Sequence, residues 1–392
     1  MKSVKRGFVI GLALLTALFL LASLRGRRQR VSEFENRFLT AHPDFSWSAL
    51  LDGSYFSGWD EYLADHVAWR DEMMRDWLWL RLHVKKQLLV NDVFLSDEAL
   101  LPYLGEQRFG SEDYASLAEA AVGRLDRVRQ AAEQTGGRFL FFGVEGQSVI
   151  FRDGYPSYLS THVDYYERCA SAFRTAMEAA KLPAVYLRDV LEAEGGSAKP
   201  YYSAVDHHYN LLGAYESYAA ICRWCREQGL EVPIVEREAL NIRPSEAEFL
   251  GTYNRKLYGL SPITDPLLIF DASALPAYQR WDDGKRTDAP LLQLPKAGAR
   301  IQYSAYMGGD LGETVIRTDR PELPNVLIVG DSFTNPVEAL LVGSFNEIRS
   351  LDFRKYTEMT LTEYLQAHPA DVVVVLRDSL NYVGDEGNGD LK

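Results

Sequence analysis

The chain has 392 residues, of which 47% are hydrophobic, 12% aromatic and 25% charged. This composition excludes a disordered polymer and is sufficient for one large folded domain with appended segments. The formal net charge is −13, even though the first thirty residues contain Lys and Arg without any Asp or Glu. The remaining chain is therefore strongly acidic and would repel a phosphate backbone, which argues against nucleic acid as a partner.

An uncharged stretch, GFVIGLALLTALFLLASL at 7–24, follows Lys2, Lys5 and Arg6. Its 18 residues are just enough to span a hydrocarbon core of about 30 Å. A cleaved signal peptide is the alternative, but the apolar run ends at LRGRRQR without a small-x-small cleavage site. We therefore predict an uncleaved membrane anchor within residues 1–30. Cations flank it on both sides, so the positive-inside rule does not fix its orientation.

Residues 31–112 are predicted to form a polar entry followed by aromatic-rich amphipathic helices. Between residues 46 and 88 the apolar side chains recur mostly every three or four positions, and Trp and Tyr are frequent among them. Aromatic residues in such a pattern are typical of a core or an interface rather than of a ligand cage.

From residue 113 onward, helical patterns alternate with short apolar runs. Helices are predicted near 116–137, 162–181, 211–229, 335–343 and 360–367, and strands at RFLFFGVEG, PAVYLRDV, NVLIVG, NEIRSLDFR and DVVVVL. Buried strands that alternate with helices indicate an α/β domain, 113–392, with a parallel sheet covered on both faces. Residues 235–320 are rich in Pro, Gly and Asp, which predicts an insertion or a small β-rich subdomain.

The first candidate for chemistry is Ser332, in Gly330-Asp331-Ser332-Phe333 between a predicted strand and a predicted helix. A Ser at this position lies at the carboxyl edge of a parallel sheet, and the helix N-terminus beside it favours the oxyanion of acyl transfer. An ordinary turn with an N-capping Ser remains the alternative.

The second candidate is Asp206-His207-His208, which precedes the helix predicted at 211–229. A nucleophilic Ser needs a base, and the base needs a carboxylate, so this segment can supply both. Either His can be the base on spacing alone, and the alternatives are an N-cap role for Asp206 and imidazoles that are merely buried and hydrogen-bonded. No second cluster of ligands accompanies these residues, and Cys222 and Cys225 lie within a predicted helix, so no metal and no cofactor are predicted.

Together the two motifs resemble the DHHW protein family and its relatives of the alginate O-acetyltransferase type, which are SGNH-hydrolase-like proteins. In these proteins a DxH segment precedes a GDSF-like serine motif, the reverse of the usual SGNH order. The resemblance covers most of residues 33–380. It rests on Glu35-Asn36-Arg37, DHHY at 206–209, YMGGD at 306–310, GDSF at 330–333, FNEIRSLDFRKY at 345–356 and the terminal DVVVVL.

The resemblance implies Ser332 as nucleophile, His208 as base and Asp206 as the acid that orients it. It adds substrate or oxyanion candidates: Tyr306, Gly308, Gly309, Asp310 and Arg354. Two features depart from the family pattern besides Tyr209 in place of Trp. The segment Val144-Glu145-Gly146-Gln147 lacks a Pro and Lys found in relatives, and Asp310 stands where an Asn is expected.

The function implied is acetyl transfer to an extracytoplasmic polysaccharide, with a multispanning membrane acyltransferase as the donor partner. The same resemblance orients the predicted anchor so that residues 31–392 lie outside the cytoplasm of a bacterial cell. A carbohydrate esterase with the same triad, and a non-catalytic glycan-binding scaffold of an export complex, remain alternatives.

Overall fold

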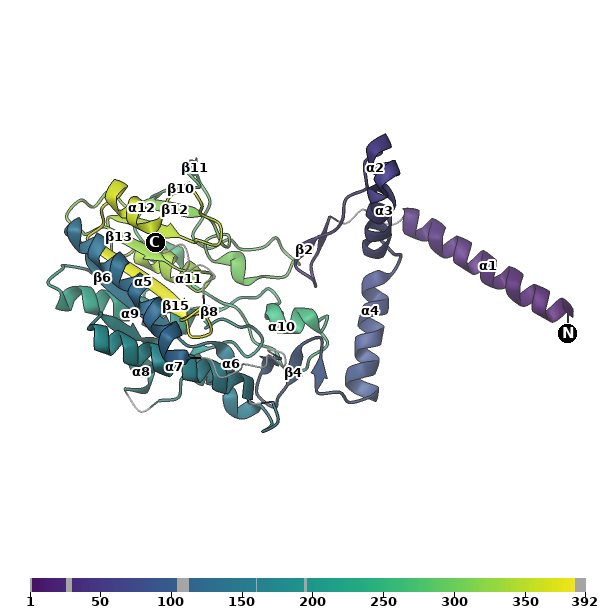
Figure 1. The fold of residues 1–392 in the computed structure, drawn as a ribbon, viewed down its shortest axis with the longest axis horizontal. Coiled ribbons are helices and arrows are strands. Elements are labelled where there is room, and N and C mark those ends of the chain that lie inside the picture. Colours follow the sequence, from purple (N-terminus) through teal and green to yellow (C-terminus); the bar gives the residue numbers. More distant parts are fainter. Residues whose placement is uncertain (1, 26–29, 104–112, 160, 194–195, 385–392) are drawn as a thin grey trace. The chain divides into compact units, whose positions relative to one another are not determined.

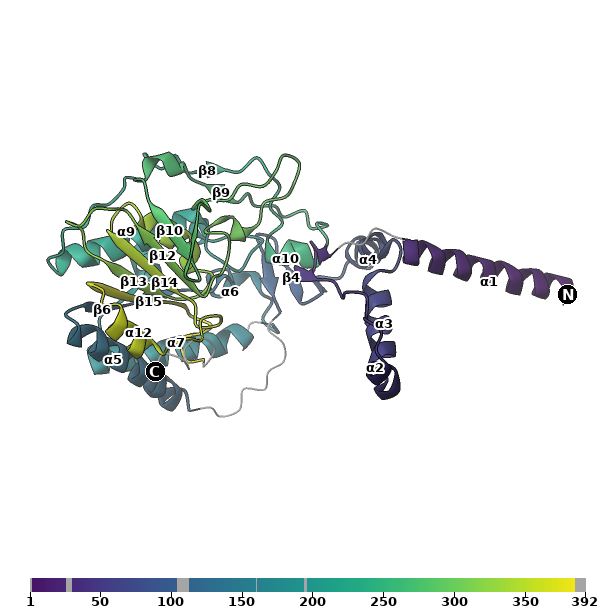
Figure 2. The ribbon, with the colours of Figure 1, turned by 90° about the horizontal axis from the view of Figure 1, so that it is seen from above.

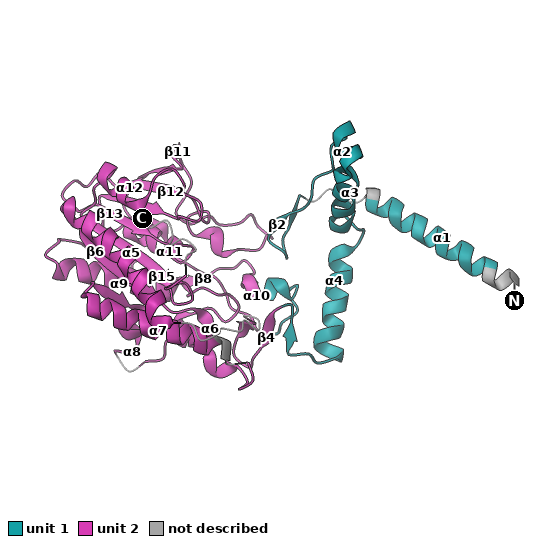
Figure 3. Ribbon diagram, in the orientation of Figure 1, with its two compact units in different colours: residues 1–91, 254–262 teal, residues 92–253, 263–392 magenta. Residues whose placement is uncertain are grey.

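The computed structural model describes residues 2–25, 30–103, 113–159, 161–193 and 196–384. The chain divides into two compact units (Figure 3): unit 1 is Met1–Asn91 with Asn254–Pro262, and unit 2 is Asp92–Tyr253 with Ile263–Lys392. Within unit 2, the Leu100 amide donates to the Ala204 carbonyl at 2.8 Å and so joins the segment after Asp92 to the rest of the unit. The boundary predicted at 112 lies outside the described residues.

Unit 1 opens with α1 (Lys2–Arg25), in which Arg6–Ser23 is long and apolar enough to cross a membrane. A helix of this kind near the N-terminus is either a membrane anchor or a signal sequence. The elements that follow are β1 (Val31–Ser32), β2 (Arg37–Phe38), α2 (Trp47–Asp52), α3 (Ser54–Asp65), α4 (Arg70–Trp79), the π-helical turn η1 (Leu80–Val84) and β3 (Leu89–Val90).

The aromatic-rich segment of unit 1 is helical, as its periodicity indicates, but its side chains are poorly covered. Within the described part of the chain, α2 and α3 bury no side chain, and α4 buries Leu78 alone. Helices of this length are marginal in water without a packed face.

The elements of unit 2 follow in chain order, with α10 crossing the unit boundary after Tyr253. They are β4 (Val93–Leu95), β5 (Leu100–Pro102), α5 (Tyr114–Gln134), β6 (Arg138–Val144), α6 (Gln147–Ile150), η2 (Arg152–Gly154), α7 (Thr161–Ala180), β7 (Ala184–Tyr186), α8 (Leu187–Glu192), η3 (Lys199–Tyr201), α9 (Leu211–Glu227), β8 (Arg243–Pro244), α10 (Gly251–Lys256), β9 (Leu268–Ile269), η4 (Ala272–Ala274), β10 (Gln279–Asp282), β11 (Lys285–Thr287), η5 (Tyr303–Ala305), β12 (Glu313–Arg317), β13 (Val326–Val329), α11 (Thr334–Leu341), β14 (Glu347–Leu351), α12 (Leu361–Ala367) and β15 (Val372–Asp378).

A sheet with the strand order β11-β10-β12-β14-β13-β15-β6-β7 forms the centre of unit 2 (Figure 1). From β14 to β7 each strand is parallel to its neighbours, which confirms the predicted parallel sheet. The insertion adds β12, β10 and β11 to one edge as antiparallel strands. Parallel pairing needs a long crossover, whereas an antiparallel hairpin needs only a short turn, so a segment without long helices joins the sheet in this way.

Helices cover both faces of this sheet, as predicted (Figure 2). Alternate residues of β6, β13 and β15, among them Phe141, Val329 and Val375, share one core cluster with α5, α7 and α12. Helix α9 lies on the opposite face, and α11 contacts it. Because both faces of the sheet are covered, successive residues of its strands are apolar rather than alternating with polar ones.

One predicted strand is only partly a strand in the structure. Of PAVYLRDV at 183–190, only Ala184–Tyr186 pairs with the sheet, and the chain turns into α8 at Leu187. Leu187 and Leu191 are both buried, and this spacing of four residues is helical, but Leu191 lies just after the end of the PAVYLRDV segment.

Candidate active site

Ser332 lies in the turn that joins β13 to α11, at the carboxyl edge of the parallel sheet. Asp331 fixes this turn: its side chain accepts a hydrogen bond from the Phe333 amide at 3.0 Å, and its carbonyl accepts one from the Thr334 amide at 2.9 Å. Gly330 is required because a Cβ there would lie 2.2 Å from Thr334 Cγ2. Ser332 is partly exposed between buried neighbours, so its hydroxyl is accessible from a rigid turn.

The Asp206–His208 segment forms a closed loop ahead of α9. Tyr202 and Tyr209 form an isolated antiparallel bridge at its base, and the Ser203 amide donates to the His208 carbonyl at 3.2 Å. The N-cap of α9 is Asn210, whose side chain accepts from the Leu212 and Gly213 amides. The alternative role of Asp206 as N-cap is therefore wrong, since Asn210 occupies that position.

The structure brings Ser332, His208 and Asp206 into one hydrogen-bonded relay across 124 residues of sequence. His208 Nε2 lies 2.7 Å from Ser332 Oγ, and His208 Nδ1 lies 2.6 Å from Asp206 Oδ1. The hydroxyl of Tyr209 donates to the Phe333 carbonyl, which ties the histidine loop to the serine turn. Between the two histidines, geometry therefore selects His208 as the partner of Ser332.

Asp206 is buried and held by more donors than the imidazole alone. Its Oδ2 accepts from the Thr252 amide at 2.6 Å and from the Thr252 hydroxyl at 2.9 Å. Burial by itself would raise the pKa of Asp206, but the neighbouring His207 and His208 and the bond from Thr252 outweigh it and lower the pKa well below its usual range. The carboxylate is thus ionised and oriented throughout the neutral range.

Two residues of this site were missed by sequence reasoning. Thr252 holds Asp206, and Tyr303 stacks on His208 with ring centroids 3.7 Å apart and planes at 3°. Neither belongs to a recognisable motif. Both come from the insertion, where the sequence contains no periodic pattern that could have indicated them.

Tyr303 offers a test of how the imidazole is held. Its hydroxyl is buried and has no hydrogen-bond partner among the described residues. Tyr303→Phe keeps the stacked ring and removes an unsatisfied hydroxyl. We therefore expect the free energy of unfolding to increase by about 1 kcal/mol while activity is unchanged. Tyr303→Leu removes the stack, and we expect kcat to fall about tenfold or more because a misplaced base loses rate steeply. Denaturant titration and steady-state kinetics measure the two effects, and loss of activity in Tyr303→Phe would contradict the purely supportive role.

None of the hydrogen bonds described here joins the remaining predicted site residues to the relay, although the Tyr306 ring lies 5.1 Å from the Tyr303 ring that stacks on His208. The Asp310 carboxylate accepts from Asn335 Nδ2 and Arg354 Nη2, each at 3.0 Å, and Arg354 also pairs with Asp352. Tyr306 is fully buried and donates its hydroxyl to the Leu268 carbonyl. These contacts hold the 306–310 loop against α11, and a part in substrate binding stays a prediction.

Both glycines of the 306–310 loop have left-handed backbone conformations. Gly308 has φ +84 and Gly309 has φ +97, and a Cβ at Gly308 would lie 2.4 Å from Gln293 Nε2. These positions therefore require glycine for the loop to close. Their role as oxyanion donors stays a prediction.

The segment 144–147, where relatives have Pro and Lys, is buried at the end of β6. The Glu145 amide donates to the Tyr202 hydroxyl at 3.2 Å, and the Gly146 amide donates to Ser379 Oγ at 3.1 Å. Gln147 is buried and donates to the Leu100 carbonyl. The segment thus braces the loop that precedes Asp206.

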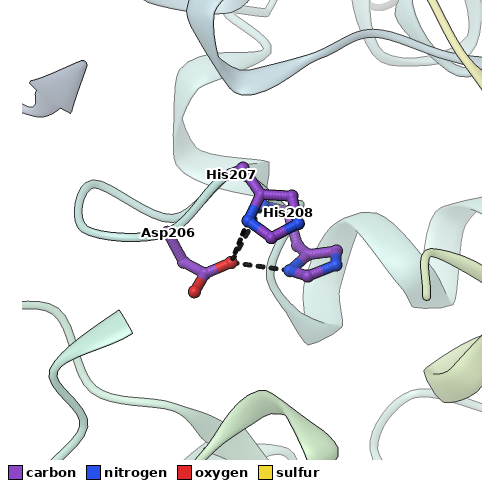
Figure 4. A group of neighbouring side chains, drawn as sticks. All are labelled: Asp206, His207 and His208. Atoms are coloured by element: carbon purple, nitrogen blue, oxygen red, sulfur yellow. Dashed lines mark hydrogen bonds and ion pairs between the residues drawn. The ribbon is translucent and has the colours of Figure 1, made fainter. Parts of the chain in front are cut away.

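Among the residues that the structure describes, Asp206, His207 and His208 form a group that could hold a metal ion (Figure 4), since each offers a ligand atom and these atoms lie within 4.8 Å of one another. Oxygen and imidazole nitrogen ligands suit zinc. However, both ring nitrogens of His208 already lie at hydrogen-bond distance from Asp206 and Ser332. An ion at this position would take His208 out of the relay.

No protein-family model and no curated protein matches this chain, but solved structures do. A DHHW family protein from Eubacterium siraeum aligns with a TM-score of 0.54 at 20% identity over 77% of this chain and 95% of its own. This chain has the DHHW protein fold. PatB1 of Bacillus cereus, solved with a sulfonyl adduct, aligns with a TM-score of 0.63 at 17% identity over 78% of this chain and 98% of its own.

The fold predicted from the two motifs is thereby confirmed. In this chain the histidine loop lies beside the serine turn, and Tyr209, the fourth residue of its motif, joins the two. The O-acetyltransferase domain of Pseudomonas putida AlgJ aligns less well, with a TM-score of 0.44 at 16% identity over 75% of this chain and 93% of its own.

Proposed function

We propose that this protein is a serine O-acyltransferase that acetylates an extracytoplasmic polysaccharide. One observation carries the proposal: a partly exposed Ser332 lies 2.7 Å from an imidazole that is itself 2.6 Å from a buried carboxylate. Nucleophile, base and orienting acid are the set that acyl transfer through an acyl-serine requires. The resemblance to alginate O-acetyltransferases supports acetyl as the group transferred.

In the first half-reaction, Ser332 Oγ attacks the acetyl carbonyl of the donor, and His208 Nε2 takes the hydroxyl proton. The buried Asp206 carboxylate stabilises the imidazolium that forms and holds its Nδ1–H. Collapse of the tetrahedral intermediate releases the donor alcohol, which receives the proton from His208, and leaves an acetyl ester on Ser332.

The developing oxyanion needs donors beside Ser332. The Ser332 amide is the first donor that we propose, because it lies at the N-terminal end of α11, where backbone N–H groups favour negative charge. Gly308 and Gly309, whose loop is held against α11, are candidates for further donors. Asp310 cannot serve as an amide donor, and its oxygens are already bonded to Asn335 and Arg354.

In the second half-reaction, a sugar hydroxyl replaces the donor alcohol. His208 takes its proton, the sugar oxygen attacks the acetyl-serine, and Ser332 Oγ regains the proton as it leaves. A carbohydrate esterase would use water at this step with the same residues. The transferase and the esterase therefore differ only in the acceptor of the acetyl group, and identifying the acetylated product distinguishes them.

Helix α1 places the reaction at a membrane if it is retained as an anchor, with unit 2 on the extracytoplasmic side. Under this proposal a multispanning membrane acyltransferase delivers the acetyl group. The acidic composition remains compatible with a glycan and opposes nucleic acid.

The proposal is tested by trapping the acyl-enzyme. Purified full-length protein is incubated with a small acetyl ester, with and without oligosaccharide, in the presence of EDTA. We expect mass spectrometry of peptides to show acetyl on Ser332, faster ester turnover when the oligosaccharide is present, and acetylated sugar as product. PatB1 carries a sulfonyl adduct in its solved structure, and we likewise expect a sulfonyl fluoride to modify Ser332 here.

The outcomes separate the candidate functions. Acetate without acetylated sugar would assign the protein as an esterase. Turnover abolished by EDTA and restored by zinc would favour a metal at Asp206, His207 and His208. If the protein is folded and no adduct forms on Ser332, the remaining candidate function is that of a non-catalytic glycan-binding scaffold.

A further inference from the structure

Helix α4 carries an exposed apolar stripe that nothing in the described part of the chain covers. Trp69, its N-cap, is 59% exposed, Met73 is 45% exposed and Trp77 is 48% exposed. Residues four apart lie on one side of a helix, so these three side chains form a continuous line, here called the α4 stripe. The opposite side carries Leu78, which is buried.

The stripe begins against the candidate membrane span. The ring of Trp69 lies 6.2 Å from that of Phe19, and the Ala68 amide donates to Ser23 Oγ at 3.0 Å. Phe19 and Ser23 belong to the last turns of the span Arg6–Ser23. The start of α4 is therefore fixed beside the end of α1, with Trp69 next to a residue of the span itself.

The course of α4 sets where the rest of the stripe lies. Within unit 1, α4 runs across the direction of α1 (Figures 1 and 2). If α1 crosses a bilayer, α4 consequently lies along its surface. Met73 and Trp77 share the side of Trp69, which contacts Phe19, so this side faces the bilayer.

We propose that the α4 stripe inserts into the boundary between head groups and acyl chains of the bilayer that α1 crosses. Tryptophan prefers this depth, and a helix with one apolar side lies in the plane of the interface. The occupant of the exposed stripe is thus lipid. The inference rests on membrane insertion of α1 and is independent of acyl transfer.

The charges around the stripe indicate which lipid property matters. Glu72 and Asp76 are exposed and adjoin the stripe on α4, while Lys85 Nζ lies 4.7 Å from the Trp77 ring centroid. Because both acidic and basic groups border the stripe, anionic head groups would add little electrostatic attraction to its binding. We therefore expect insertion into neutral phosphatidylcholine, driven by apolar area.

The test places a fluorescent probe on each side of α4 in the full-length protein. Met73→Cys lies within the stripe, and Arg75→Cys is an exposed matched control on the other side of the helix. Both are labelled with an NBD dye and reconstituted into phosphatidylcholine vesicles, since the native cysteines Cys169, Cys222 and Cys225 are buried. We expect the probe at 73 to lose most of its fluorescence to a nitroxide on the lipid, and the probe at 75 to lose it to aqueous iodide.

Two results would overturn the proposal. Equal iodide quenching at both positions would place the stripe in water, and protection of position 73 from both quenchers would show that protein covers it. Because labelling alters the site, Trp77→Phe provides a second measurement: it should reduce quenching of the intrinsic fluorescence by brominated lipid. Extraction of the chain by carbonate would remove the premise that α1 is inserted, and the proposal with it.

Discussion

Replacing Ser332 with alanine is expected to lower turnover of an acetyl ester by about 10⁴- to 10⁶-fold, because the change deletes the one oxygen that would form the proposed acyl-enzyme. His208→Ala should cost about as much, since His208 Nε2 lies 2.7 Å from that oxygen and is the proton acceptor that we propose for it. The double variant should lose little more than either single variant, because members of a relay act as a unit. Steady-state kinetics on all three variants measures this non-additivity.

His207→Ala is the matched control for this series. The two imidazole rings lie 3.7 Å apart, but the hydrogen-bond relay runs through His208. We expect a loss smaller by orders of magnitude, with thermal unfolding used to confirm that each variant is folded. If His207→Ala were the inactive variant and His208→Ala active, the base would be the neighbouring residue. Activity that survives Ser332→Ala would refute the serine mechanism.

Asp206→Asn is expected to lower kcat by about 10⁴-fold while the fold is retained. The asparagine side chain has the same shape as the aspartate, but its amide either donates an N–H to His208 Nδ1 or makes no hydrogen bond to it. The imidazole is then no longer held in the tautomer that leaves Nε2 free to accept a proton. Thr252 would also lose a charged acceptor, since its amide and hydroxyl both donate to Oδ2. Steady-state kinetics near neutral pH measures the loss.

The same variant changes the acid stability of the protein. The pKa of Asp206 is lower in the folded chain than in the unfolded chain, so its stabilisation is fully present above about pH 4 and is lost as pH falls. Asp206→Asn should therefore lose stability at neutral pH and show a weaker dependence on pH in acid. Denaturant titrations at several pH values measure the difference.

Asp265→Asn controls for the loss of a buried carboxylate in this region. Asp265 Oδ2 accepts from the Ala204 amide at 2.9 Å, and an Asn oxygen can keep that bond. Burial raises the pKa of Asp265, the opposite direction to Asp206. We expect activity close to that of the unchanged protein, and an equal loss in both variants would show that local folding rather than the relay is responsible.

Much of the fold follows from local patterns in the sequence. Strands such as Val326–Val329 and Val372–Asp378 are buried on both faces, as their continuous runs of apolar residues predict. The PAVYLRDV segment shows the limit of such patterns. A short apolar run fits a strand and a helix equally, and only the packing of Leu187 and Leu191 decides for the helix.

The sequence alone was enough to identify the serine turn and the histidine loop as candidates, because GDSF and DHHY are local motifs of consecutive residues. Spacing left either histidine open, the family resemblance implied His208, and the structure places His208 within hydrogen-bond distance of Ser332. That Thr252 holds Asp206 and that Tyr303 stacks on the imidazole could be learned only from the tertiary structure. These contacts join segments 46 to 124 residues apart. Periodicity describes which side of one element is buried, whereas such distant contacts depend on how whole elements pack, and no local pattern contains that information.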